Sequence, residues 1–249
     1  MEQHPHKLED DPILEAIFEI RFTSRTENVA DLLPGLLFQS LREKYPKLEA
    51  LSIFSVPREI READPNFKYK PTHRLLGDNY AITTGEHVVS LSCNKPYSGW
   101  IKFRPVIKET LSYLKDTMLV DNVHRFSMKY VNLLIEDKIP LQLGMIKNKI
   151  VLGSHDLSST LTNIRTEIDK NDFINIVQVV SGATARVKTG QEIKGLILEI
   201  DTIYNKQFKD FWIDIDELLD SAHTTEKSIF FDILTEETIK KLKPVWEKQ

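Results

Sequence analysis

Residues 12–22 have the sequence PILEAIFEIRF, and this stretch decides where the fold begins. Its alternate positions are apolar, at Leu14, Ala16, Phe18, Ile20 and Phe22. The positions between them are of mixed character and include Glu15, Glu19 and Arg21. A period of two that is sustained this long is typical of a β-strand with one buried face. We therefore expect a half-buried strand at residues 12–22.

The composition indicates a globular protein with a small excess of acidic residues. Of the 249 residues, 41% are hydrophobic, and a chain of this length buries roughly 70–75% of its unfolded surface. A net charge of −4 from 33 basic and 37 acidic residues argues against a dedicated nucleic-acid surface, so we do not expect nucleic acid as a partner.

The single cysteine, Cys93, excludes an internal disulfide and a cysteine-based zinc site, and it fits a reducing, cytoplasmic setting. No apolar run approaches the roughly 20 residues that span a bilayer, so we expect no membrane association. The seven histidines have no metal-ligand spacing. We therefore expect neither a metal site nor a cofactor.

Apolar residues at helical spacing predict three principal helices, at residues 29–45, 105–118 and 213–234. Asn28 is the expected N-cap of the first helix, and Pro34 and Gly35 favour a proper start only at Pro34. Thr235 is expected to cap a short terminal helix that reaches Leu242. The second helix is expected to carry Met118 on its buried stripe.

Residues 57–71 form a charged, proline-bearing stretch that we expect to be a loop. Alternating and β-branched residues predict further strands: these are at 73–76, 80–84, 87–93, 123–136, 175–180, 183–188 and 194–202.

The predicted strands and helices do not alternate regularly, which argues against a parallel, doubly wound sheet. The sequence therefore predicts an α+β protein with a mainly antiparallel sheet and three principal helices. We divide it into a flexible leader at residues 1–11, a first α+β half at 12–136 and a second α+β half at 137–249. The two halves are either related units or parts of one continuous domain.

Four segments in the same order resemble a sporadically distributed family of uncharacterised bacterial proteins of about this length. The segments are PILEAIFEIRF at 12–22, GWIKF at 99–103, RFSMKYVN at 125–132, and the stretch from Ala222-His223 to Leu234-Thr235-Glu236. One departure is Lys129, where the family pattern has Arg, and Lys does not reproduce the bidentate geometry of a guanidinium. The resemblance implies an accessory role in bacteria, in defence or on mobile elements, and it supplies no catalytic residues.

Charged residues on alternate strand positions are the first candidate ligand-binding set. The candidates are Glu15, Glu19, Arg21, Arg125, Lys129, Glu199 and Asp201. If their strand faces line one cavity, carboxylates could hold a metal ion while Arg and Lys hold a phosphate. The alternative is a sheet surface on which these residues form cross-strand ion pairs.

Tyr130 and Asn132 are further candidates for ligand binding, on the other face of the strand that carries Lys129. The alternative is a core face whose polar groups find buried partners. Trp100 lies among basic and aromatic residues and is a candidate for contact with a partner, although packing at a sheet-to-helix junction is the interpretation we favour.

The sequence contains none of the compact motifs of a serine nucleophile, a phosphate-binding glycine loop or a dinucleotide fold. Our first hypothesis is therefore a non-enzymatic cytoplasmic module that binds a protein or a small-molecule ligand, with a homodimer as the expected oligomer. The alternative is a metal-dependent phosphohydrolase or nucleotide-processing enzyme with a charged cavity. Whether the protein is an enzyme is left open by the sequence.

Overall fold

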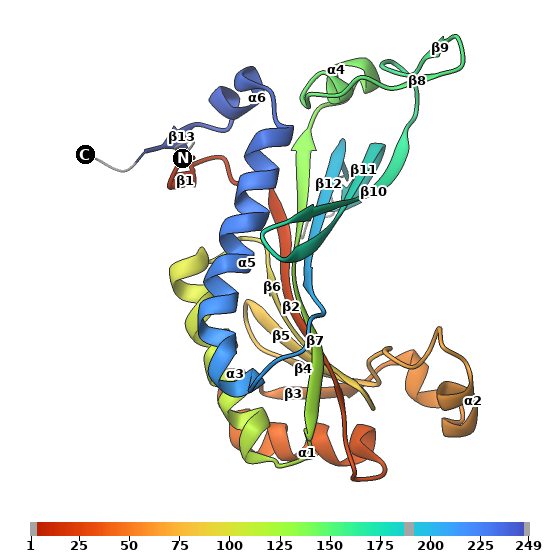
Figure 1. Cartoon of the computed structure of the whole chain (residues 1–249), viewed down its shortest axis with the longest axis vertical. Coiled ribbons are helices and arrows are strands. Elements are labelled where there is room, and N and C mark those ends of the chain that lie inside the picture. The colour runs from red at the N-terminus through yellow and green to blue at the C-terminus, as the bar shows by residue number, and fades with distance from the viewer. Residues whose placement is uncertain (1–3, 187–191, 247–249) are drawn as a thin grey trace. The chain divides into compact units, whose positions relative to one another are not determined.

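The computed structural model describes residues 4–186 and 192–246 (Figure 1). It is an α+β fold with 38% strand and 31% helix, built on a nine-stranded antiparallel sheet in the order β10-β11-β12-β7-β2-β6-β5-β4-β3. Three helices in the described part of the chain have seven or more residues: α1 (Val29–Leu41), α3 (Trp100–Asp116) and α5 (Phe211–Ile233). The predicted fold class is confirmed.

The strands of the large sheet are β2 (Ile13–Thr23), β3 (Lys47–Ala50), β4 (His73–Leu76), β5 (Tyr80–Thr84), β6 (Val88–Asn94), β7 (Asn122–Ile135), β10 (Asn163–Lys170), β11 (Phe173–Arg186) and β12 (Glu192–Tyr204). Two small sheets pair β1 (Lys7–Leu8) with β13 (Pro244–Val245), and β8 (Val151–Leu152) with β9 (His155–Asp156). The short helices are α2 (Arg58–Ala63), α4 (Ile139–Leu143), α6 (Glu236–Lys241) and the 3₁₀ helix at Ser52–Ser55.

Contacts group the chain into two compact units, and each unit combines separate segments of the sequence. Unit 1 contains residues 1–14, 129–202 and 221–249, and unit 2 contains residues 15–128 and 203–220. The predicted boundary between residues 136 and 137 falls within unit 1. Of the predicted leader, residues 1–3 lie outside the described residues, and Lys7–Leu8 form β1.

The first strand has the predicted alternation. Ala16, Phe18, Ile20 and Phe22 are at most 3% exposed and the intervening side chains are half-buried, but Leu14, which was expected on the buried face, is half-buried as well. Phe18 pairs with Leu91 of β6 in the antiparallel register. In unit 2, α1 packs on β4 and β5, and α3 packs on β6 and on α1.

The start of α1 differs from the prediction. The helix begins at Val29, with Pro34 inside it, and Asn28 has a φ of 60° and makes no side-chain capping bond. The carboxylate of Glu86, from the β5–β6 turn, instead accepts hydrogen bonds from the backbone N–H groups of Val29 (3.2 Å) and Ala30 (3.1 Å). A carboxylate at this position satisfies N–H groups that lack a helical partner and interacts favourably with the helix dipole.

The second helix is displaced towards the N-terminus. It begins at Trp100 after Gly99, which has a φ of 83°, and Phe103 N–H donates to the Gly99 carbonyl (2.9 Å). It ends at Asp116, so Met118 is 85% exposed and the prediction that it is buried was wrong. Proline is favoured in the first turn of a helix, which made Pro105 a misleading start signal.

Three further differences concern local structure. The stretch expected to be a loop at 57–71 contains α2, and β10 was not predicted. Strands expected at 175–180 and 183–188 belong to the one strand β11, with residues 187–188 outside the described part.

The predicted cap at Thr235 is confirmed, because its side chain accepts a hydrogen bond from Thr238 N–H (3.3 Å).

The core of unit 1 lies between the sheet and the C-terminal part of α5. Leu196, Leu198 and Ile200 of β12 are fully buried and cluster with Ile229 and Phe230 of α5. The strand alternation of β12 and the helical spacing on α5 therefore bring two apolar faces together, as expected of a layered α+β fold.

Candidate anion-binding site

The residues predicted to bind a ligand are divided between the units. Glu15, Glu19, Arg21 and Arg125 belong to unit 2, and Lys129, Tyr130, Asn132, Glu199 and Asp201 belong to unit 1. The contacts of each set are therefore described within its own unit.

In unit 2, Glu19 is the centre of a small ion-pair cluster. Arg21 Nε donates to Glu19 Oε1 (2.9 Å), and Arg125 Nη1 lies 3.6 Å from the same oxygen. The Arg21 guanidinium also lies 4.3 Å from the centroid of the Tyr69 ring, at cation–π distance. The contacts of Glu19 match the alternative of ion pairs on the sheet surface.

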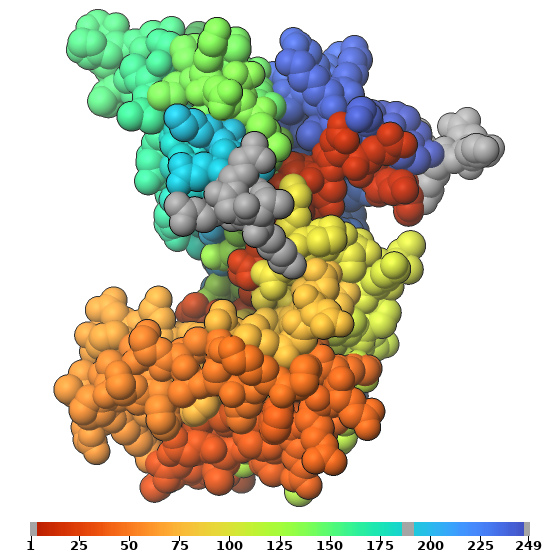
Figure 2. Space-filling view, turned by 180° about the vertical axis from the view of Figure 1, so that it is seen from behind, coloured from red at the N-terminus to blue at the C-terminus, as the bar shows by residue number. Residues whose placement is uncertain are grey.

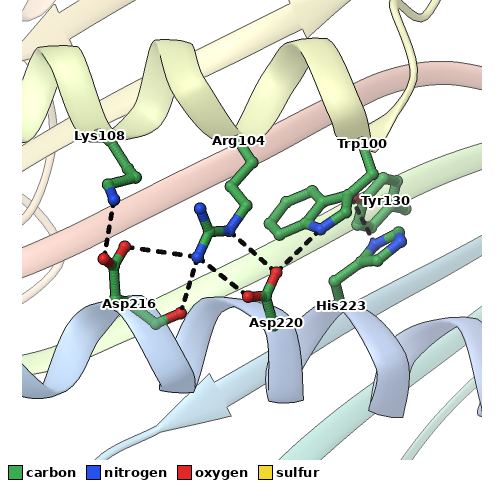
Figure 3. A network of polar contacts seen from close by, with 7 residues as sticks. All are labelled: Trp100, Arg104, Lys108, Tyr130, Asp216, Asp220 and His223. Atoms are coloured by element: carbon green, nitrogen blue, oxygen red, sulfur yellow. Dashed lines mark hydrogen bonds and ion pairs between the residues drawn. The ribbon is translucent and has the colours of Figure 1, made fainter.

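In unit 1, the predicted polar groups contact other protein groups. Lys129 Nζ lies 2.9 Å from Glu199 Oε1, and Asn132 Nδ2 donates to the Leu198 carbonyl (3.1 Å). Tyr130 Oη lies 3.2 Å from His223 Nδ1 (Figure 3). Asp201 is 8% exposed. The Lys129–Glu199 contact matches the alternative of cross-strand ion pairs, and the contacts of Tyr130 and Asn132 match the alternative of buried partners for polar groups on a core face.

Trp100 belongs to a network that joins α3 to the N-terminal half of α5 within unit 2 (Figure 3). Its indole N–H donates to Asp220 Oδ1 (3.1 Å), and Arg104 donates to both oxygens of Asp220 (2.9 Å each). Lys108 Nζ donates to Asp216 Oδ2 (2.7 Å). The indole N–H of Trp100 therefore makes a contact between helices of the same unit.

A basic pocket of about 310 Å³ lies in unit 2, and the segment from α2 to Lys70 supplies most of its wall. This segment lies at the molecular surface in the view of Figure 2 (orange). The pocket is lined by Arg58, Arg61, Glu62, Phe67, Lys68, Lys70, Glu86 and His87.

Both carboxylates of the basic pocket are already engaged. Glu62 forms an ion pair with Arg58 one helical turn away, and Glu86 caps the N-terminus of α1. Among the described residues, no carboxylate lies within ion-pair distance of the remaining cations, Arg61, Lys68 and Lys70. Their charge is therefore available to an anion.

Two histidines lie beside this positive charge. The Tyr69 ring is 6.5 Å from the His87 ring and 6.2 Å from the His124 ring. His87 Nδ1 is buried and has no hydrogen-bond partner among the described residues. Burial lowers the pKa of His124, and the charges of Lys68, Arg21, His87 and Arg125 lower it further. Burial is the larger cause, and the neighbouring positive charges act in the same direction, because both disfavour the charged imidazolium.

We expect Lys68→Ala to raise the pKa of His124, because the substitution removes a positive charge that lowers this pKa more than those of Arg21, His87 and Arg125 do. Titration of the His124 ring protons by NMR measures this change directly. Lys102→Ala removes the same charge from an exposed position on α3 and should leave the titration unchanged. An unshifted His124 titration in Lys68→Ala would contradict the proposed field.

Sequence reasoning missed the basic pocket, although its residues lie in a stretch recognised as charged. Acidic and basic residues are mixed at 57–71, so local net charge gives no signal. The structure brings four cations and two carboxylates together in the lining, where Glu62 pairs with Arg58 and Glu86, from a turn between strands, caps α1.

No family model matches the chain, and no curated protein matches it. Within residues 4–186 and 192–246, no three or more His, Cys, Asp or Glu side chains are placed to hold a metal ion. None of the helices in that part of the chain is long and apolar enough to cross a membrane.

Proposed function

We propose that the protein is a cytoplasmic, non-enzymatic binding protein that takes a small phosphate-bearing ligand in the basic pocket of unit 2. The observation that carries the proposal is the presence of three cations, Arg61, Lys68 and Lys70, in one pocket whose two carboxylates already have partners, Glu62 in Arg58 and Glu86 in the N-terminus of α1. The resemblance to a bacterial family supports an accessory role for the protein.

The chemistry of the pocket favours a phosphate over a carboxylate or a neutral ligand. Arg61 Nε donates to the Val56 carbonyl (3.1 Å), which holds the guanidinium in place. Lysine contributes a mobile point charge, and arginine a planar donor, and both groups commonly bind phosphate oxygens. Lys68 and Lys70 can therefore adjust to a phosphate beside a fixed Arg61.

The size of the pocket limits the ligand. A volume of about 310 Å³ is at the small end of the roughly 300–1,000 Å³ typical of ligand pockets. Phe67 adds an apolar surface to the lining, against which a base or sugar ring can pack. A nucleotide or a sugar phosphate satisfies both requirements.

Calorimetric titration with pyrophosphate and with adenosine 5′-diphosphate tests the proposal. We expect binding that weakens as salt rises, and we expect the double variant Lys68→Ala/Lys70→Ala to lose at least about tenfold in affinity, or about 1.4 kcal/mol. The double variant Lys102→Ala/Lys115→Ala makes the same charge change on exposed positions of α3 and should bind like the wild type.

Two results would contradict the proposal. Equal affinity of both double variants would show that these anions bind outside the basic pocket. Chromatography of the ligand after incubation detects any conversion of the diphosphate. Such a conversion would show that the protein is an enzyme. An intact ligand and a selective loss in the pocket variant would support a binding protein.

A further inference from the structure

The strand β10 ends the large sheet, and among the described residues it is paired on one side only, with β11 (Figure 1). It has eight residues and no proline, and most of its side chains are exposed. The strand at the other end of the order, β3, has only four residues. An uncovered strand edge of this length presents a row of backbone groups to which another strand can pair.

The backbone groups on the open side belong to the odd-numbered residues. Ser181 N–H donates to the Thr162 carbonyl (2.9 Å), and the Ile168 carbonyl accepts from the Asn175 side chain (3.0 Å), so even-numbered residues face β11. In an antiparallel ladder the N–H and C=O of one residue point to the same side, and this side alternates along the strand. The outward residues are therefore Asn163, Arg165, Glu167 and Asp169.

We propose that the partner of this edge is β10 of a second copy of the chain, paired antiparallel about a two-fold axis at Thr166. In this register Arg165 lies opposite Glu167 of the second copy, and Asn163 lies opposite Asp169 of the second copy. All four outward residues then exchange backbone hydrogen bonds across the interface. The contact is isologous, as a closed dimer requires.

The side chains of β10 favour this register over its neighbours. A two-fold axis at Glu167 places the two copies of Glu167 opposite each other, and an axis at Arg165 places the two copies of Arg165 opposite each other. Like charges directly opposite each other destabilise a sheet. With the axis at Thr166, each Arg165 instead faces a glutamate. The Arg165–Glu167 pair within one strand is exposed, at 3.4 Å, and leaves both side chains accessible to a second copy.

The other face of the strand is also complementary to itself. Ile164 lies opposite Ile168 of the second copy, in a pair without backbone hydrogen bonds, where side chains approach most closely. In the sheet, Ile164 is the neighbour of Val179 in the ladder with β11, and Val179 is buried. Ile168 is 37% exposed, so pairing extends the apolar face of unit 1 into the second copy.

Light scattering gives the mass of the full chain in solution, and sedimentation equilibrium gives the dimer dissociation constant of the wild type and of charge variants. We expect Arg165→Glu and Glu167→Arg each to raise the dimer dissociation constant at least about tenfold, because each places like charges opposite each other. The double variant Arg165→Glu/Glu167→Arg exchanges the charges and should restore the dimer. Both substitutions are on exposed side chains, and circular dichroism checks that each of the three variants is folded.

Cysteine cross-linking tests the register. Thr166→Cys places two thiols opposite each other at the axis and should form an intermolecular disulfide under mild oxidation. Asp169→Cys lies on the same exposed strand, opposite Asn163 of the second copy, and should not cross-link efficiently. The native Cys93 is buried and should not contribute.

A wild-type chain that stays monomeric at about 0.1 mM would overturn the proposal, since the interface would then contribute under about 5.5 kcal/mol. A dimer that both single charge variants leave intact, or that Thr166→Cys does not cross-link, would place the interface elsewhere. These outcomes are independent of the basic pocket, because β10 belongs to unit 1 and the pocket residues to unit 2.

Discussion

Glu226→Gln should stabilise the protein strongly above pH 8 and hardly at all below pH 4.5. Glu226 lies on α5 with an exposed fraction of 5%. Burial raises the pKa of its carboxyl from 4.5 to about 8, and the nearby charge of Lys227 offsets only part of this increase. The folded protein therefore keeps this carboxyl protonated at neutral pH, which is the expected response of an acid removed from water.

The sign of the pH dependence follows from proton binding. Between pH 4.5 and 8 the folded state holds a proton that the unfolded state releases, so rising pH lowers the free energy of unfolding across this window. Above pH 8 the folded protein contains a buried carboxylate, and the free energy of unfolding has by then fallen by roughly 5 kcal/mol relative to its value below pH 4.5. Glutamine has nearly the same shape and does not ionise, so the variant avoids this loss.

Urea unfolding at pH 5, 7 and 9 measures the effect. The advantage of Glu226→Gln over the wild type should increase with pH up to about pH 8 and then level off. Asp232→Asn removes an exposed acidic charge from the same helix and serves as the control, with little change at any pH. A constant difference between Glu226→Gln and wild type would refute the buried, protonated carboxyl.

Gly195→Ala should lower the free energy of unfolding by roughly 3 kcal/mol, at the upper end of the cost of overpacking a core. Gly195 lies in β12, next to β7 in the sheet. A Cβ atom at this position would overlap the carbonyl oxygen of Leu134 and lie 2.9 Å from Leu133 Cδ1. The obstacle includes backbone of a paired strand, which cannot move aside as a flexible side chain can.

The same substitution at Gly144 is the control, because it lies in unit 1 as well. A Cβ atom there would be 3.4 Å from the Leu141 carbonyl and 3.5 Å from the Pro140 carbonyl, and its φ of −69° suits any residue. Gly144→Ala should therefore change stability by no more than about 0.5 kcal/mol. Equal urea midpoints for the two variants would show that β7 and β12 can separate without cost.

Local patterns in the sequence were sufficient to predict those features that depend only on residues close together in the chain. The alternation at residues 12–22 predicts β2 and its buried face, and the side chain of Thr235 caps α6 as expected. Such features depend on periodicity and on hydrogen bonds between residues close in the chain, so an isolated sequence contains the relevant information.

Features that depend on distant residues were determined only by the tertiary structure. The N-terminus of α1 is capped by Glu86 and not by the adjacent Asn28, and Glu86 lines the same basic pocket as Arg61 and Lys68. β10 was missed because its exposed, charged residues lack an apolar period, and its pairing with β11 defines it. The sequence by itself determined the fold class and the first strand, because periodicity is local. The tertiary structure decided which strands pair and which partner each charged side chain contacts, because both depend on residues that are distant in the sequence.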